Sequence, residues 1–111
     1  MPKTDPAREA LLTALEASGV SIPLWDGILI EETVRVAPGA TILPGCILRG
    51  NTTIAAGSVI GPGSVLTDAV IGKNCIVGAG SVLKGAYPAG SLIVQKRQTT
   101  ATVYPLERTE K

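Results

Sequence analysis

Residues 54–65 read IAAGSVIGPGSV, which is one six-residue unit written twice. Each unit begins with isoleucine, has glycine at its fourth position and ends in serine and valine. This spacing fits neither the 3.6-residue period of an α-helix nor a simple hairpin ladder. A short strand followed by a tight turn does fit, because glycine permits turn conformations that other residues resist.

The repeat extends well beyond this stretch, and its anchors are aliphatic. They fall six residues apart, except for one step of five between Leu66 and Ile71, at Ile30, Val36, Ile42, Leu48, Ile54, Ile60, Leu66, Ile71, Val77 and Leu83. Four residues after each anchor from Ile30 to Val77 comes a small or β-branched residue: Val34, Ala40, Cys46, Thr52, Ser58, Ser64, Val70, Cys75 and Ser81. Internal periodicity of this kind indicates a solenoid.

Three such units would close one triangular coil, so that every third anchor stacks on the same side. The first side then holds Ile30, Leu48 and Leu66, the second Val36, Ile54 and Ile71, and the third Ile42, Ile60 and Val77. These columns make a core without aromatic residues, in keeping with a chain that is 45% hydrophobic, 3% aromatic and free of phenylalanine. The sequence therefore predicts an all-β fold, a parallel β-helix of about three coils.

The segments flanking the repeat predict a cap and a tail. Asp5 can cap a helix over residues 5–19, Pro6 suits its first position and Gly19 its left-handed stop. Its apolar face would hold Ala7, Ala10, Leu11, Ala14 and Leu15. We expect a capping helix and linker over residues 1–28, the β-helix over 29–88 and a C-terminal tail over 89–111.

Charge and composition restrict the partners. The net charge of +1 argues against nucleic acid, and no apolar run approaches the ~18 residues of a membrane span. The N-terminus has no secretory pattern, so we expect a cytoplasmic protein with Cys46 and Cys75 as reduced, inward corner thiols. The chain has no histidine, which removes the commonest general base and metal ligand, and no metal site is expected.

One outward column is apolar throughout. Side chains alternate along a strand, so the residue before each anchor points outward. On the first side these residues, which we call the first-side column, are Leu29, Ile47, Val65 and Val82. Because such a column is unfavourable in water, it predicts the centre of an oligomer interface, most naturally in a homotrimer.

The units IAAGSVIGPGSV and IGKNCIVGAGSV (residues 71–82) resemble those of the hexapeptide-repeat acyltransferase superfamily. Residues 36–72 and 77–98 are similar to the acetyltransferase domain of bifunctional N-acetylglucosamine-1-phosphate uridylyltransferase/glucosamine-1-phosphate acetyltransferase, in shortened form. The resemblance implies a left-handed coil, a homotrimer and acetyl-CoA bound between neighbouring coils.

Departures from that family bear on activity. Its nucleotidyltransferase domain is absent from this sequence, and the central coils that carry its catalytic histidine are missing. For acetyl-CoA, the resemblance aligns Ala79 with a contacting alanine and Lys96 with a basic residue near the phosphates, whereas Pro62 replaces an expected serine. No catalytic residue is assigned, although Asp68 could act as a base or simply occupy a solvated turn.

Two functions remain open from the sequence. The first is a small trimeric protein of the sugar-nucleotide acyltransferase type that has lost catalysis and serves as a binding or assembly module, with a possible partner enzyme of sugar-nucleotide metabolism. The second is a CoA-dependent acyltransferase that acetylates an amino sugar or nucleotide sugar. A positioned base is worth about 10²–10⁴ in rate, so transfer by proximity alone would be slow.

Overall fold

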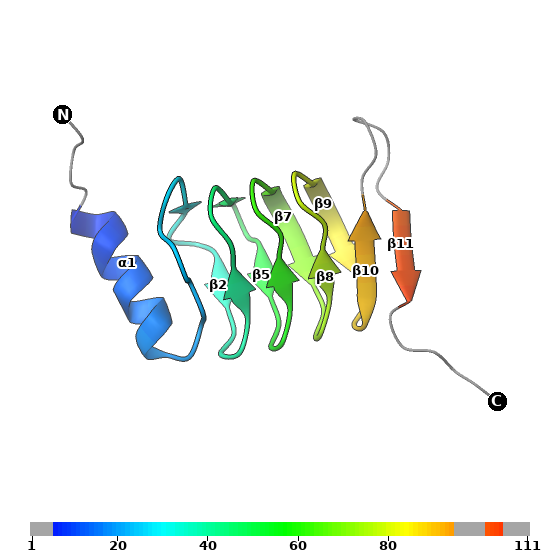
Figure 1. The fold of residues 1–111 in the computed structure, drawn as a ribbon, viewed down its shortest axis with the longest axis horizontal. Helices are drawn as coiled ribbons and strands as arrows, with labels where there is room; N and C mark the ends of the chain where they lie inside the picture. The colour runs from blue at the N-terminus through cyan, green and yellow to red at the C-terminus, as the bar shows by residue number, and fades with distance from the viewer. Residues whose placement is uncertain (1–5, 95–101, 106–111) are drawn as a thin grey trace.

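The structure, a computed structural model, describes residues 6–94 and 102–105, and consists of one helix followed by a stack of short strands (Figure 1). The elements in chain order are α1 (Pro6–Ala17), β1 (Leu29–Ile30), β2 (Arg35–Val36), β3 (Thr41–Ile42), β4 (Ile47–Arg49), β5 (Thr53–Ile54), β6 (Val59–Ile60), β7 (Val65–Ile71), β8 (Ile76–Val77), β9 (Val82–Tyr87), β10 (Ser91–Val94) and β11 (Thr102–Pro105). The helix covers one end of the stack and β11 lies at the other (Figure 1).

The strands stack in parallel on three sides, as the hexad period predicts. On the first side β1, β4, β7 and β9 follow one another, and Leu48 pairs with both Ile30 and Leu66. The second side is built from β2, β5 and the C-terminal halves of β7 and β9. The third side is built from β3, β6, β8 and β10, with β11 added antiparallel at its edge.

The coil is longer than the expected three turns. Ser21 forms a parallel bridge with Thr41 below the first complete turn, and β10 pairs with β8 above the last one. The third column therefore runs from Ile22 to Ile93, both of them buried. These flanking rungs lack the glycine-rich unit that marks the repeat, so counting hexads gives about three turns where the structure has about four. The left-handed parallel β-helix with a short N-terminal helix is otherwise confirmed.

The helix ends where the sequence predicts, and Leu11 and Leu15 of the expected apolar face pack against the core together with Leu12. The N–H groups of Gly19 and Val20 donate to the carbonyls of Glu16 and Leu15, and Gly19 has a φ of 109°. This is a Schellman stop, for which glycine is suited. Leu12, which lies outside the expected face, is fully buried, whereas Ala7, Ala10 and Ala14 of that face are exposed. A leucine removes more apolar surface from water than the alanines do, so it sets the orientation of the helix.

The five-residue step shifts one corner of the coil. The register between β7 and β9 changes between Leu66 and Ala69, which marks a bulge. Ala69 is fully buried and fills the corner, while Val70, expected there by counting four from Leu66, is 48% exposed. The shortened step thus moves the inward corner position back by one residue.

The other corners hold small polar side chains whose hydrogen bonds follow the stack. Ser64 Oγ lies 3.2 Å from the carbonyl oxygen of Gly78 in the next coil, and Ser58 Oγ lies 2.6 Å from that of Gly72. Cys46 Sγ approaches the carbonyl oxygen of Gly61 at 3.1 Å. Within the described residues, no buried side-chain nitrogen or oxygen lacks a partner. The corner hydroxyls and thiols are therefore part of the scaffold.

Candidate functional site

The first-side column stands in a single file on the outer surface. Register pairs Leu29 with Ile47, Ile47 with Val65 and Val65 with Val82. Leu29 and Val82 are 43% and 60% exposed, and the two between them are half-buried. The structure thus places all four residues as the alternation predicts, on a surface available to a second chain.

The residues aligned with acetyl-CoA ligands are only partly covered by the structure. Ala79 is exposed in the turn that joins the third side to the first. The N–H of Gly80 donates to the carbonyl of Pro62 at 2.8 Å, so Pro62 lies directly one coil below this turn. Lys96 lies outside the described residues. The corner therefore presents small apolar groups where the resemblance implies a cofactor contact.

The carboxylate of Asp68 is hydrogen-bonded to the backbone of the adjacent coil. Its carboxylate accepts a hydrogen bond from the N–H of Asn51 at 2.8 Å, and its own φ is 49°. Gly50, below it, has a φ of 65°, a left-handed conformation that favours glycine, and a Cβ there would also meet that carboxylate. Asp68 is exposed at the bulge within β7, so it is solvated as one of the two alternatives expects, although it lies in a strand and not in a turn.

The thiols are placed as expected but offer no nucleophile. Cys46 and Cys75 are free, buried and located at different corners. Burial raises the pKa of the Cys46 thiol from its ordinary value of 9.0. Cys75 Sγ lies 3.1 Å from the carbonyl oxygen of Pro88. Because the thiolate is the reactive form, a buried thiol with a raised pKa is inert at neutral pH.

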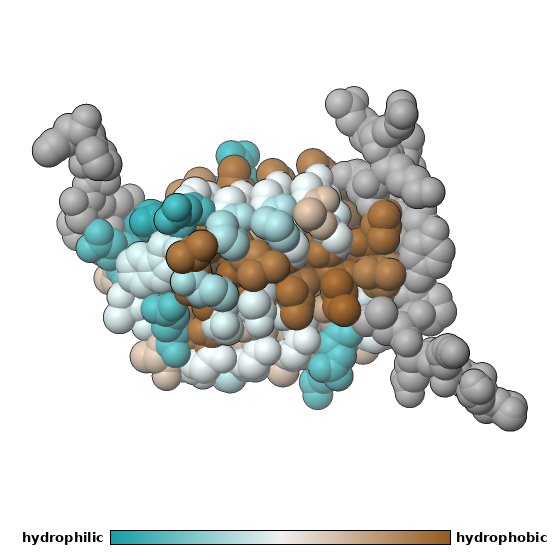
Figure 2. Space-filling model, in the orientation of Figure 1, coloured by the Kyte–Doolittle hydropathy of each residue, from teal (hydrophilic) through white to brown (hydrophobic). Residues whose placement is uncertain are grey.

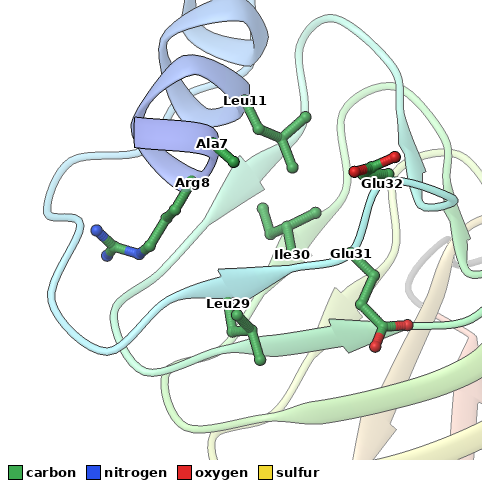
Figure 3. A pocket seen from close by; sticks show the side chains of 7 residues that line it. All are labelled: Ala7, Arg8, Leu11, Leu29, Ile30, Glu31 and Glu32. Carbon is green, nitrogen blue, oxygen red and sulfur yellow. The ribbon is translucent and has the colours of Figure 1, made fainter. Parts of the chain in front are cut away.

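A cavity of about 320 Å³ lies between α1 and the first coil. In Figure 3, Ala7, Leu11 and Ile30 face one another across it, while the guanidinium of Arg8 points away. Arg8 donates instead to the carbonyls of Trp25 and Ile28, which ties the helix to the linker. No pattern in the sequence predicts this cavity, because it forms only when the helix docks on the coil.

The rim of this cavity carries two carboxylates, Glu31 and Glu32. Glu31 accepts a hydrogen bond from the N–H of Gly50 at 2.8 Å. Two negative charges at the rim disfavour a phosphorylated ligand such as CoA. In the part of the chain that is described, no group of three or more His, Cys, Asp or Glu side chains could hold a metal ion. No helix there is long and apolar enough to cross a membrane.

Comparison with known proteins agrees with this geometry. Residues 51–85 match the family model described as bacterial transferase hexapeptide (six repeats). The chain is 42% identical over 65 residues to the bifunctional protein GlmU of Tropheryma whipplei, which covers 59% of this chain and 11% of that protein. It is 39% identical over 69 residues to GlmU of Thermus thermophilus, covering 62% and 15% respectively. The chain thus spans less than a fifth of the length of these relatives.

Solved structures share the fold. The serine acetyltransferase of Neisseria gonorrhoeae superposes with a TM-score of 0.72 at 24% identity, covering 81% of this chain and 37% of that one. The serine acetyltransferase of Brucella abortus gives a TM-score of 0.68 at 24% identity, covering 78% and 37%. With the matching family model over residues 51–85, these neighbours confirm that the chain resembles the hexapeptide-repeat acyltransferases in both sequence and fold.

Proposed function

We propose that this protein is a homotrimeric binding or assembly module of the sugar-nucleotide acyltransferase type that does not catalyse acetyl transfer itself. It would work in the cytoplasm, where its two free thiols stay reduced, and would bind a partner enzyme that handles sugar nucleotides. The fold and the relation to GlmU support the type of protein.

The main support for the proposal is that each candidate reactive group is either hydrogen-bonded to the backbone of the coil or buried inside it. Asp68 accepts a hydrogen bond from the N–H of Asn51, and the hydroxyls of Ser58 and Ser64 donate to carbonyl groups of the next coil. Cys46 is buried with its pKa raised. Deprotonating an attacking amine needs a base within hydrogen-bond reach of the substrate, and histidine is absent from the sequence.

Two features support a trimer: the apolar surface of the first side and the small size of the stack. A stack of about four turns has two open ends and a narrow core, so it gains little burial by itself. The first-side column exposes aliphatic side chains along that stack, including Leu29 and Val82. Packing this column against other copies removes it from water, and cyclic symmetry closes the assembly.

The second candidate is a CoA-dependent acyltransferase acting on an amino sugar or nucleotide sugar. It is favoured by one observation, the exposed corner at Ala79, which would be accessible to an acetyl-CoA molecule that lies along the coil. On this reading acetyl-CoA is the cofactor, Lys96 approaches its phosphates, and the acceptor amine arrives deprotonated because no base is at hand.

A turnover assay separates the two candidates. The purified protein is mixed with acetyl-CoA and a panel of amino sugars and amino-sugar phosphates, and free CoA is followed with a thiol reagent. The proposal predicts CoA release at the rate of the protein-free control. Protein-dependent release that falls in both Ala79→Arg and Lys96→Ala, but not in the exposed helix variant Glu16→Gln, would establish the acyltransferase and overturn the proposal.

A further inference from the structure

The cavity between α1 and the first coil has apolar walls that are open to solvent. Two of the lining side chains, Ala7 and Leu11, come from α1, and two others, Leu29 and Ile30, form β1. Ala7 and Leu29 are exposed, whereas Ile30 is only 7% exposed and forms the floor. An apolar group of a ligand that entered between the helix and the strand would leave water and contact these side chains.

The size of the cavity limits the ligand to a small molecule. Its volume of about 320 Å³ lies at the lower end of the range for ligand pockets, about 300–1,000 Å³. At roughly 30 Å³ for each water-sized group, it has room for roughly ten non-hydrogen atoms. A short aliphatic chain fits this space, and a nucleotide does not.

The charge at the rim selects the sign of the ligand. Glu31 and Glu32 follow β1 directly, are exposed, and lie on the side of the cavity opposite Arg8 (Figure 3). Apart from the hydrogen bond that Glu31 accepts from the N–H of Gly50, their carboxylates are open to a ligand. Neither forms an ion pair with another residue that the structure describes, including Arg49 in the next coil. Two such charges at one end of an apolar cavity attract a cation and repel an anion.

We propose that this cavity binds a small aliphatic amine in its charged, ammonium form. The ammonium group lies at the carboxylates of Glu31 and Glu32, and the hydrocarbon chain packs against Leu11 and Ile30. An aliphatic amine with a pKa like that of lysine, about 10.4, carries its charge at neutral pH. This inference goes beyond the proposed function and does not rest on it, because Leu29 is the only residue of the first-side column that lines the cavity.

The test is isothermal titration calorimetry with three ligands that share a six-carbon chain and differ in charge: hexylamine, hexanol and hexanoate. An exposed ion pair strengthens binding by up to about fivefold, so two carboxylates should make hexylamine bind about fivefold to tenfold more tightly than hexanol. Hexanoate should bind most weakly. A failure of hexylamine to show saturable binding, or equal binding of the amine and the alcohol, would overturn the proposal.

Substitutions at the rim test the source of the selectivity. Glu31→Gln and Glu32→Gln keep the size of each side chain and remove its charge, so each should weaken hexylamine binding by about twofold to fivefold. The double variant should bind hexylamine and hexanol equally. Glu16→Gln, an exposed change on α1 away from the cavity, is the matched control and should leave binding unchanged. Unchanged hexylamine affinity in the double variant would contradict the assignment of the carboxylates.

A second pair of variants tests the location. Ala7→Phe places a ring in the cavity, and we expect it to weaken hexylamine binding by more than about tenfold. Ala10→Phe makes the same change at an exposed position of α1 that does not line the cavity, and should bind like the wild type. Equal affinities of the two variants would show that the amine binds elsewhere. Circular dichroism checks that each variant is folded.

The outcomes are independent of the proposed function. A protein of trimeric mass that does not bind hexylamine would overturn the amine site and leave the assembly module. A protein of monomeric mass that binds hexylamine through Glu31 and Glu32 would overturn the trimer and support the amine site.

Discussion

Substitutions at Asp68, in the bulge of β7, test whether its carboxylate stabilises the coil. Its hydrogen bond to the N–H of Asn51 is 2.8 Å long, and its backbone adopts a left-handed φ of 49°. Asp68→Ala removes the acceptor, which is worth about 0.5–1.5 kcal/mol, and leaves an alanine where aspartate and asparagine are better tolerated, at about 1 kcal/mol. We expect the free energy of unfolding to fall by about 1.5–2.5 kcal/mol.

Asp68→Asn keeps both an acceptor oxygen and the tolerance for a left-handed φ, so its loss should stay below about 1 kcal/mol. Urea denaturation followed by circular dichroism, with all variants at one protein concentration, measures these differences. Glu16→Ala, an exposed change on α1, serves as the control. Equal stability of Asp68→Ala and the wild type would refute this prediction, because it would show that the hydrogen bond from Asn51 to the carboxylate does not stabilise the coil.

Three further changes test the coil. Leu66→Ala empties a fully buried position in the middle of its column and should cost about 2–5 kcal/mol in urea denaturation. Gly61→Ala would drive its new Cβ to 2.5 Å from the carbonyl oxygen of Val77, so we expect a loss of about 1–3 kcal/mol in the same measurement. Because burial raises the pKa of Cys46, its contribution to stability is complete below the unfolded pKa and is lost as pH rises above about 9. Denaturation between pH 7 and 10 should show this loss in the wild type and a smaller one in Cys46→Ala.

The coil could be predicted from sequence because its core is strictly periodic. Each anchor from Ile42 to Leu66 is buried by the same local geometry, so counting residues is enough to place it. Counting residues no longer places a side chain correctly where the six-residue period changes. Counting four residues from Leu66 places Val70 at an inward corner, because the five-residue step does not say on which side of the bulge the missing residue falls. Only the pairing of β7 with β9 locates it.

Features that depend on contact between distant segments could not be predicted. The helix has several apolar positions, and its docking on the coil, not its own pattern, selects Leu12 for burial. The cavity beside Arg8 forms from that docking.

The most direct test of the account is the molar mass of the wild-type protein by light scattering across a range of concentrations. The account predicts about three times the 11.3 kDa of a single chain, unchanged on dilution into the low micromolar range. A mass of 11.3 kDa at all concentrations would contradict it, because the first-side column would then be left in water with no second copy to cover it.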